Sequence, residues 1–424
     1  MRLLFVSNLF PPFHIGGYEL VCQKTADGLR ERGHHVEVLT STHGSGVVEE
    51  DTVHRVLSCA YRPPDFFPDA SATETRRNSQ ILAGEIARLK PEVVVLWNLH
   101  GLGMHRLYRT ALDQAKHVAT RLGDYQLWPN WDAGQPIHRE SLAILLDPRL
   151  RCAANSRTLG QDLVGVGMKP NQVAVLHAYV QSNWDPLPQP PPPPTPLRLL
   201  WAGRIDGTKG LDVAAEGAIL LARDWRIPTR LDIGGWGDEE LLASCLARVA
   251  TAAEAEAVDL QARYLGPVDT HQLAELFPRY HAYVASSVGH DTFPMTPVEA
   301  MAAGAPVVAS RLGGLVEITG GGELGLLFEP GNAADLARQL NRLATDKGLV
   351  AKLRTRARQQ AEVRFRREVA ISRFEAFVGA CAAGLDVASM PPSVPKMSDR
   401  EVFGESTTSR LLGSARHLLS RTRV

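Results

Sequence analysis

The chain begins with MRLLFVSNLFPPFHIGGYELVCQKTADGLRERGHHVEVL (residues 1–39), and this stretch decides the fold. Residues 3–7 are apolar and short, which is typical of a buried strand, and a glycine-containing loop follows. Residues 18–32 have the apolar spacing of a helix, Gly33 can end that helix, and residues 36–39 form a second apolar run. Strand, loop, helix and strand make a βαβ unit, from which parallel sheets covered by helices are built.

The same alternation continues on both sides of a proline-rich segment at residues 185–196. Its five consecutive prolines cannot donate sheet hydrogen bonds, so we interpret it as a semi-rigid linker; a surface loop within one domain is the alternative. The pattern predicts an α/β protein with two Rossmann-like parallel-sheet domains, at residues 1–184 and 197–383, the second ending in a closing helix. Two such sheets facing each other would enclose a central cleft, with ligands at the carboxyl ends of the strands. Further strands are predicted at residues 92–96, 118–121, 197–202, 229–233, 262–265, 282–286 and 306–309, and helices at residues 211–222, 333–345 and 350–363.

The composition limits the class of protein. The chain has 424 residues, enough for two or three domains, and 46 Lys and Arg residues balance 46 Asp and Glu residues. This balance disfavours a general nucleic-acid binder, for which a basic domain is usual. The five cysteines form no Cys-x-x-Cys pair, and no apolar run approaches the roughly 20 residues that span a bilayer, so we expect a cytoplasmic protein.

Residues 384–424 differ from the rest and are predicted to be a flexible tail, because they are rich in Ser, Thr and Pro. The final part, from Arg410 to Val424, carries four Arg and no acidic residue. A solvated tail is the favoured interpretation. The alternative is a basic interfacial helix that makes peripheral contact with the inner membrane face or docks on a partner.

Three predicted loops lie where strands give way to helices. The first contains Gly16 and Gly17, whose backbone N–H groups could approach an anion at the start of the following helix. The pair could equally serve only to turn the chain.

The second loop, Trp201–Gly210, carries two cations. Arg204 follows Gly203 at the end of a predicted strand, and Lys209 comes just before the next helix. A guanidinium can bind a phosphate through two parallel hydrogen bonds and an ammonium supplies a compact charge, so the pair suits a pyrophosphate. Two surface cations on a turn are the alternative.

The third loop, Ser286–Gly304, carries two carboxylates, Asp291 and Glu299, eight residues apart. Carboxylates accept hydrogen bonds from sugar hydroxyls, so these two could hold a sugar and a ribose. The alternative is structural: residues 296–299 fit a capping box, in which Glu299 only caps its own helix and Asp291 only shapes the turn.

Together these loops resemble the retaining GT-B glycosyltransferases of glycosyltransferase family 4, over residues 2–377. In that family a Gly-Gly loop is followed by a helix that ends in Arg-Gly-His, here Arg32–His34. The Gly-Arg-x4-Lys-Gly loop is intact. The Glu-x7-Glu motif is present as Asp291-x7-Glu299, followed by Ala-Met-Ala-x-Gly-x-Pro-Val-Val, and a Gly-Gly-x-x-Glu motif follows at residues 313–317.

The resemblance implies transfer of a sugar from a nucleoside diphosphate sugar, with retention at the anomeric carbon, to a glycan or lipid-linked acceptor in polysaccharide biosynthesis. It implies that Arg204 and Lys209 hold the donor pyrophosphate, while Glu299 binds the ribose and Asp291 binds the donor sugar. No metal and no cofactor are expected, because the two cations do the work of a metal. The other donor-binding residues that the resemblance implies are Gly16, Gly17, Gly203, Phe293, Pro294, Met295 and Thr296.

The sequence departs from the family pattern around the sugar. The usual His of a His-Asp pair is Gly123, the first Glu of the motif is Asp291, and Pro294 removes a backbone donor. An unusual donor sugar or a weakened active site would explain these changes.

The acceptor side has three candidate residues, His100, Asp124 and Tyr125. For His100, a packed loop histidine is the alternative.

Two other functional classes are considered. One is a catalytically weakened GT-B protein that acts as a donor-binding or partner subunit, which the departures favour. The other is a nicotinamide-dependent dehydrogenase, which residues 234–237 do not support because the Gly-x-Gly-x-x-Gly spacing is missing.

Overall fold

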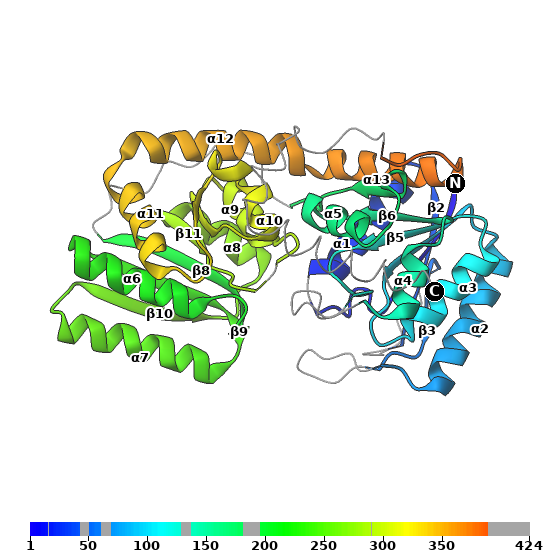
Figure 1. The fold of residues 1–424 in the computed structure, drawn as a ribbon, viewed down its shortest axis with the longest axis horizontal. Helices are drawn as coiled ribbons and strands as arrows, with labels where there is room; N and C mark the ends of the chain where they lie inside the picture. The colour runs from blue at the N-terminus through cyan, green and yellow to red at the C-terminus, as the bar shows by residue number, and fades with distance from the viewer. Residues whose placement is uncertain are drawn as a thin grey trace, which may run out of the picture. The chain divides into compact units, whose positions relative to one another are not determined.

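The structure is a computed structural model, and it describes residues 1–15, 17–42, 51–60, 69–128, 137–180, 196–289 and 291–388. The chain divides into two compact units (Figure 1). Among the described residues, the first unit contains Met1–Ala178 and residues 368–388, and the second contains Tyr179–Arg367. Gly16, the predicted linker up to residue 195 and the predicted tail from residue 389 lie outside the described residues.

The first unit is built on a seven-stranded parallel sheet with the strand order β3-β2-β1-β4-β5-β6-β7. The order reverses between β1 and β4, which makes this pair the topological switch point of the sheet. The strands are β1 (Arg2–Ser7), β2 (His35–Ser41), β3 (Val53–Leu57), β4 (Val93–Asn98), β5 (Val118–Leu122), β6 (Leu150–Ala154) and β7 (Val173–Val175).

Helices cover both faces of this sheet, because alternate residues of each strand point to opposite sides. Leu4 and Val6 of β1 belong to one large apolar core, whereas Phe5 stacks on Trp97 of β4 with ring centroids 5.7 Å apart. The helices of the unit are α1 (Gly17–Glu31), α2 (Ala72–Leu89), α3 (Met104–Gln114), α4 (Arg139–Leu145), α5 (Arg157–Gly165) and α13 (Arg367–Ala382), with a short 3-10 turn at Pro170–Gln172.

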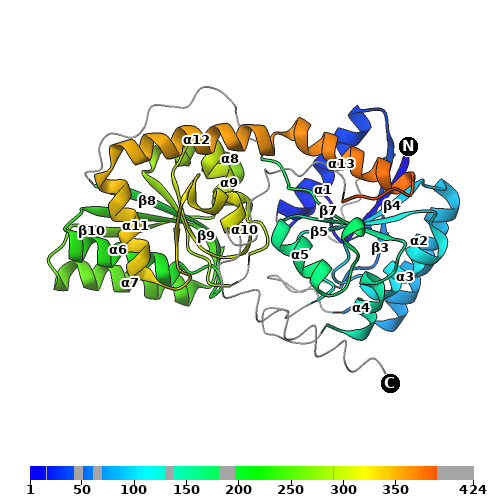
Figure 2. The same cartoon turned by 45° about the horizontal axis from the view of Figure 1, so that its top comes forward.

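The last helix, α13, corrects the predicted domain boundary. The sequence assigned it to the second domain as a closing helix, but it packs on the first unit, beside α1 (Figure 2). Phe374 of α13 lies 5.6 Å from the ring of Trp97, and its neighbour Glu375 accepts hydrogen bonds from Arg32 and His34. The apolar face of the first sheet is therefore completed by a segment that follows the whole second unit in the chain.

The second unit contains a six-stranded parallel sheet with the order β10-β9-β8-β11-β12-β13. The order again reverses once, between β8 and β11. The strands are β8 (Leu197–Ile205), β9 (Thr229–Gly237), β10 (Leu260–Gly266), β11 (Ala282–Ala285), β12 (Val307–Ser310) and β13 (Leu326–Phe328).

Two apolar cores lie on the two faces of this sheet. Leu199 and Trp201 of β8 pack with helices α6, α7 and α11, whereas Leu200 and Ala202 pack with α8, α9, α10 and α12. Asp238, Asn332 and Asp346 begin three of these helices, since each side chain accepts a hydrogen bond from a backbone N–H of the first turn. The helices are α6 (Leu211–Trp225), α7 (Glu239–Ala255), α8 (Thr270–Leu276), α9 (Met295–Ala302), α10 (Gly313–Ile318), α11 (Ala333–Thr345) and α12 (Lys347–Phe365), with 3-10 turns at Phe277–Arg279 and Gly320–Gly322.

The prediction of two Rossmann-like parallel sheets is confirmed. The chain passes to the second unit at Tyr179, before the predicted linker, and Val180 already belongs to a core of that unit. Within the described ranges, no helix has both the length and the apolarity that a bilayer span requires.

Candidate active site

Two of the predicted loops meet at the switch point of the second sheet. The loop after β8 leads into α6, and the loop after β11 leads into α9. β8 and β11 are neighbours in the sheet, so both loops leave from its carboxyl edge, side by side. This is where open parallel sheets bind their ligands.

Backbone hydrogen bonds hold the two loops together. The carbonyl oxygen of Thr208 accepts from the N–H groups of Val288 and Gly289, at 2.8 and 2.9 Å. The hydroxyl of Ser286 donates to the carbonyl oxygen of Gly210 at 2.6 Å. These hydrogen bonds join the two loops to each other.

Gly210 permits this close approach. It has φ +67°, and a Cβ atom at this position would lie 1.9 Å from the carbonyl oxygen of Ser286. Any side chain would push the loops apart, which explains the glycine that ends the Gly-Arg-x4-Lys-Gly motif.

Lys209 and Asp291 meet across the two loops. The Nζ atom of Lys209 lies 2.5 Å from an oxygen of Asp291, and the two side chains are 30% and 14% exposed. The hydroxyl of Ser287 donates to the same carboxylate oxygen at 3.4 Å. The structure thus brings together two residues that lie 82 positions apart.

Arg204 has a carboxylate partner within its own loop. Its Nε atom lies 2.6 Å from Asp206, which also accepts from the backbone and hydroxyl of Thr208. Burial alone would raise the pKa of Asp206, but these hydrogen bonds outweigh burial and lower it. In the described part of the chain this ion pair engages only Nε, so the two terminal amino groups of the half-exposed Arg204 remain available to an anion.

The capping-box interpretation of Glu299 is wrong. Helix α9 begins at Met295 with Pro294 as its N-cap, so Thr296 lies inside the helix and does not cap it. Glu299 is half-buried in the second turn. Burial raises the pKa of the neighbouring Tyr283 hydroxyl, and the negative charge of Glu299 raises it further.

The residues between the two carboxylates differ in their surroundings. Phe293 is buried against Phe365, with ring centroids 5.8 Å apart, so its side chain belongs to the core and only its backbone could face a ligand. Pro294, Met295 and Thr296 are partly exposed at the start of α9. The N-terminus of a helix favours bound negative charge.

The Gly-Gly-x-x-Glu motif at residues 313–317 contacts the loop that carries Asp291. The N–H group of Gly314 donates to the carbonyl oxygen of Asp291 at 3.0 Å. A Cβ atom on Gly314 would lie 2.2 Å from the carbonyl oxygen of Thr292, so only glycine fits there.

In the first unit, two of the three acceptor-side candidates come together. His100 follows β4, Asp124 follows β5, and the Nε2 atom of His100 lies 3.6 Å from the Asp124 carboxylate. Buried Gln126 fixes both loops, because it accepts from the N–H of Leu99 and donates to the carbonyl of Trp97. Burial alone would lower the pKa of His100, but the adjacent Asp124 outweighs burial and raises it.

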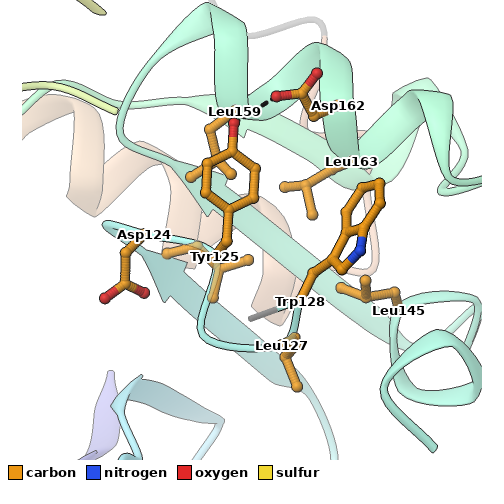
Figure 3. A pocket seen from close by; sticks show the side chains of 9 residues that line it. Asp124, Tyr125, Leu127, Trp128, Leu145, Leu159, Asp162 and Leu163 are labelled. Atoms are coloured by element: carbon orange, nitrogen blue, oxygen red, sulfur yellow. Dashed lines mark hydrogen bonds between the residues drawn. The ribbon is translucent and has the colours of Figure 1, made fainter. Parts of the chain in front are cut away.

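Tyr125 is not part of this pair. Figure 3 shows its ring in a small pocket with Trp128 and several leucines, its hydroxyl pointing to Asp162, while the carboxylate of Asp124 points elsewhere. The Tyr125 hydroxyl donates to Asp162 at 2.5 Å. Gly17 also belongs to the first unit, where it is the first residue of α1.

Two family models match the chain. Residues 15–182 match the model described as Glycosyltransferase Family 4, and residues 185–363 match Glycosyl transferases group 1. The chain is a glycosyltransferase with the GT-B fold.

A relative and two solved structures agree with this assignment. The glycosyltransferase is 28% identical to glycogen synthase of Mycobacterium tuberculosis over 391 residues, which covers 85% of this chain and 90% of the relative. Its fold matches a glycosyltransferase of Rickettsia africae with a TM-score of 0.70, at 18% identity, over 90% of this chain and 98% of the other. It also matches Anabaena HepE, solved in complex with UDP and glucose, with a TM-score of 0.66, at 16% identity, over 90% and 100% of the two chains.

Sequence reasoning missed why this glycosyltransferase has a glycine at position 123. A Cβ atom there would lie 2.5 Å from the ring of Tyr18, whose hydroxyl donates to the carbonyl oxygens of Trp97 and Arg121. Tyr18 thus fills the space that a side chain at 123 would need. The aromatic residue directly after the Gly-Gly pair was the available signal.

A group of possible metal ligands lies on β2, β3 and α2 of the first unit. Among the described residues, Glu37, His54 and Glu85 place one ligand atom each within 4.8 Å of one another. Arg88 already donates hydrogen bonds to both carboxylates, so a cationic group occupies this cluster.

Proposed function

We propose that this glycosyltransferase moves a sugar from a nucleoside diphosphate sugar to a glycan or lipid-linked acceptor, with retention at the anomeric carbon and without a metal ion. The meeting of Lys209 with Asp291 at the switch point carries the proposal. A cation therefore lies beside the carboxylate to which we assign the donor sugar. The UDP and glucose in HepE support a nucleotide-sugar donor, and the similarity to a glycogen synthase supports a glycan acceptor.

The chemistry requires stabilisation of a leaving diphosphate. As the bond from the anomeric carbon to the phosphate oxygen breaks, negative charge grows on that oxygen. Lys209 and the terminal amino groups of Arg204 would neutralise it, and preorganised charges of this kind are usually the largest contribution to catalysis. Two cations in this role make a metal ion unnecessary.

The carboxylates would bind the two sugars of the donor. Asp291 would accept hydrogen bonds from hydroxyls of the transferred sugar, and Glu299 would accept them from the ribose. In the structure, Lys209 and Asp291 form an ion pair with each other. A donor would replace this contact with one from phosphate to Lys209 and one from sugar hydroxyl to Asp291.

The pair of His100 and Asp124 would bind hydroxyl groups of the acceptor. An imidazole beside a carboxylate can accept a hydrogen bond from a hydroxyl group or donate one to it. A lipid-linked acceptor would bring the enzyme to the inner membrane face, where the basic residues after Arg410 could meet anionic lipids.

The experiment is a donor screen with purified protein. UDP-, ADP- and GDP-linked sugars are tested for nucleoside diphosphate release with and without a glycan acceptor, and in the presence of EDTA. We expect release with at least one donor, unaffected by EDTA, and an α-configured product by NMR from an α-linked donor.

Variants identify the site. Lys209→Ala should reduce turnover about 100-fold or more, by analogy with lost oxyanion-stabilising groups. Arg223→Ala is the matched control, because Arg223 is also ion-paired but lies near the far end of α6. Donor binding without turnover in the wild-type protein would support the alternative, a donor-binding subunit.

A further inference from the structure

An exposed tryptophan stands beside the proposed diphosphate site. Trp236 lies near the end of β9 and is 40% exposed. In the parallel pairing of β8 with β9, its register partner is Arg204. The indole is therefore one strand away from a cation of the donor loop.

Trp236 also lies on the face of the sheet that carries α9. Ala202 of β8 packs in the same core as α9 residues, and Arg204 is two positions further along the strand, so both point to that face. Register partners in a parallel sheet share a face. Trp236 therefore shares its side of the sheet with Glu299, the proposed ribose ligand.

Two glycines allow the backbone around Trp236 to pack closely on β8. Gly235 and Gly237 have φ +135° and +143°. Cβ atoms on them would lie 1.8 Å from the carbonyl oxygen of Gly203 and 2.2 Å from that of Ile205. The backbone on either side of Trp236 is thus in close contact with the end of β8, on either side of Arg204.

We propose that the indole of Trp236 is the surface on which the base of the nucleotide donor stacks. A planar, exposed aromatic ring beside a phosphate-binding loop offers a base the stacking contact that every base can make through its π-face. The inference rests on the proposed function, because it requires a nucleoside diphosphate at Arg204 and Lys209. It assigns a protein contact to the base, which is the part of the donor that the loop motifs do not contact.

The experiment separates the base from the diphosphate. UDP, ADP, GDP and inorganic pyrophosphate are titrated into the full chain by calorimetry, with the wild type, Trp236→Leu, Trp236→Phe and Trp225→Leu. Trp225 is the matched control, since it is similarly exposed at 37% but ends α6, about 20 Å from the start of that helix. Thermal unfolding verifies that each variant is folded.

We expect Trp236→Leu to weaken the best-binding nucleoside diphosphate about 10-fold, as loss of one base–aromatic stack does, and to leave pyrophosphate affinity unchanged. Trp236→Phe keeps a ring and should retain most of the affinity, and Trp225→Leu should change nothing. Nucleotide-dependent quenching of tryptophan fluorescence should disappear in Trp236→Phe and persist in Trp225→Leu.

Equal losses for nucleotide and pyrophosphate, or no loss for either, would overturn the stacking role while leaving the proposed function intact. A wild-type protein that binds none of the four ligands would instead refute the proposed function, and the stacking role with it.

Discussion

Asp162 provides a sharp test of the electrostatics of the first unit. The residue is 6% exposed in a pocket lined mainly by leucines, and burial raises the pKa of its carboxyl from 3.8 to about 6, even though Tyr125 donates a hydrogen bond to it. The folded protein therefore binds a proton more tightly than the unfolded chain. Stability contributed by the neutral acid is present below pH 3.8 and is lost as the pH rises to about 6.

The expected magnitude follows from the shift. Each pKa unit corresponds to 1.36 kcal/mol, so ionisation of Asp162 costs about 3 kcal/mol of unfolding free energy above pH 6. Asp162→Asn removes the charge and keeps an acceptor for the Tyr125 hydroxyl. The variant should be more stable than wild type, by an advantage that grows by about 2 kcal/mol between about pH 4.5 and about pH 7.5.

Urea unfolding at the two pH values measures this difference. Asp147→Asn is a control of opposite sign, because Arg149 donates hydrogen bonds to Asp147 and lowers its pKa. An Asp162→Asn protein that is less stable than wild type at neutral pH, or whose advantage is the same at both pH values, would show that the carboxyl is not held in an apolar site.

Three further predictions concern single residues. Gly210→Ala should abolish sugar transfer and cost more than about 1 kcal/mol of stability, because its Cβ would strike the Ser286 carbonyl, whereas Gly207→Ala in the same loop meets no atom within 4 Å and should be harmless in both assays. Glu37→Gln should lower the unfolding free energy at neutral pH by about 3 kcal/mol in urea titrations. The reason is that hydrogen bonds from Arg88, His35 and His54 outweigh burial and lower the pKa of Glu37 from 4.5 to about 2. This difference in unfolding free energy should shrink as the pH falls through that range. Asp124→Asn should lower the pKa of His100, which NMR titration of the imidazole can measure, and an unchanged pKa would contradict the observed pairing.

The sequence predicted the parts of this molecule that depend on local pattern. Apolar runs gave the strands near their observed bounds, and the spacing of Arg204, Lys209 and Gly210 marked a loop whose glycine is sterically required. The ion pair between Lys209 and Asp291 could be expected only because parallel strands end at a common edge.

The remaining features depend on contacts between distant segments. No local pattern indicates that α13 packs on Phe5 and Trp97, because its apolar residues would suit either unit. The replacement of a side chain at position 123 by the ring of Tyr18 is likewise a tertiary event. The misplaced start of α9 is a smaller error: Pro297 suits the first turn of a helix, and the true start is two residues earlier.

The return of α13 to the first unit has a consequence for dissecting the protein. Among the described residues, the second unit comes from a single range of the chain, Tyr179–Arg367, so a gene fragment encoding that range needs no joining of separate pieces. The described residues of the first unit come from two separate ranges, Met1–Ala178 and 368–388. A stop codon after α12 would remove Phe374 and leave the ring of Trp97 without one of its aromatic neighbours. The truncation would therefore destabilise the first unit and spare the second unit, although the removed residues directly follow the second unit in the chain.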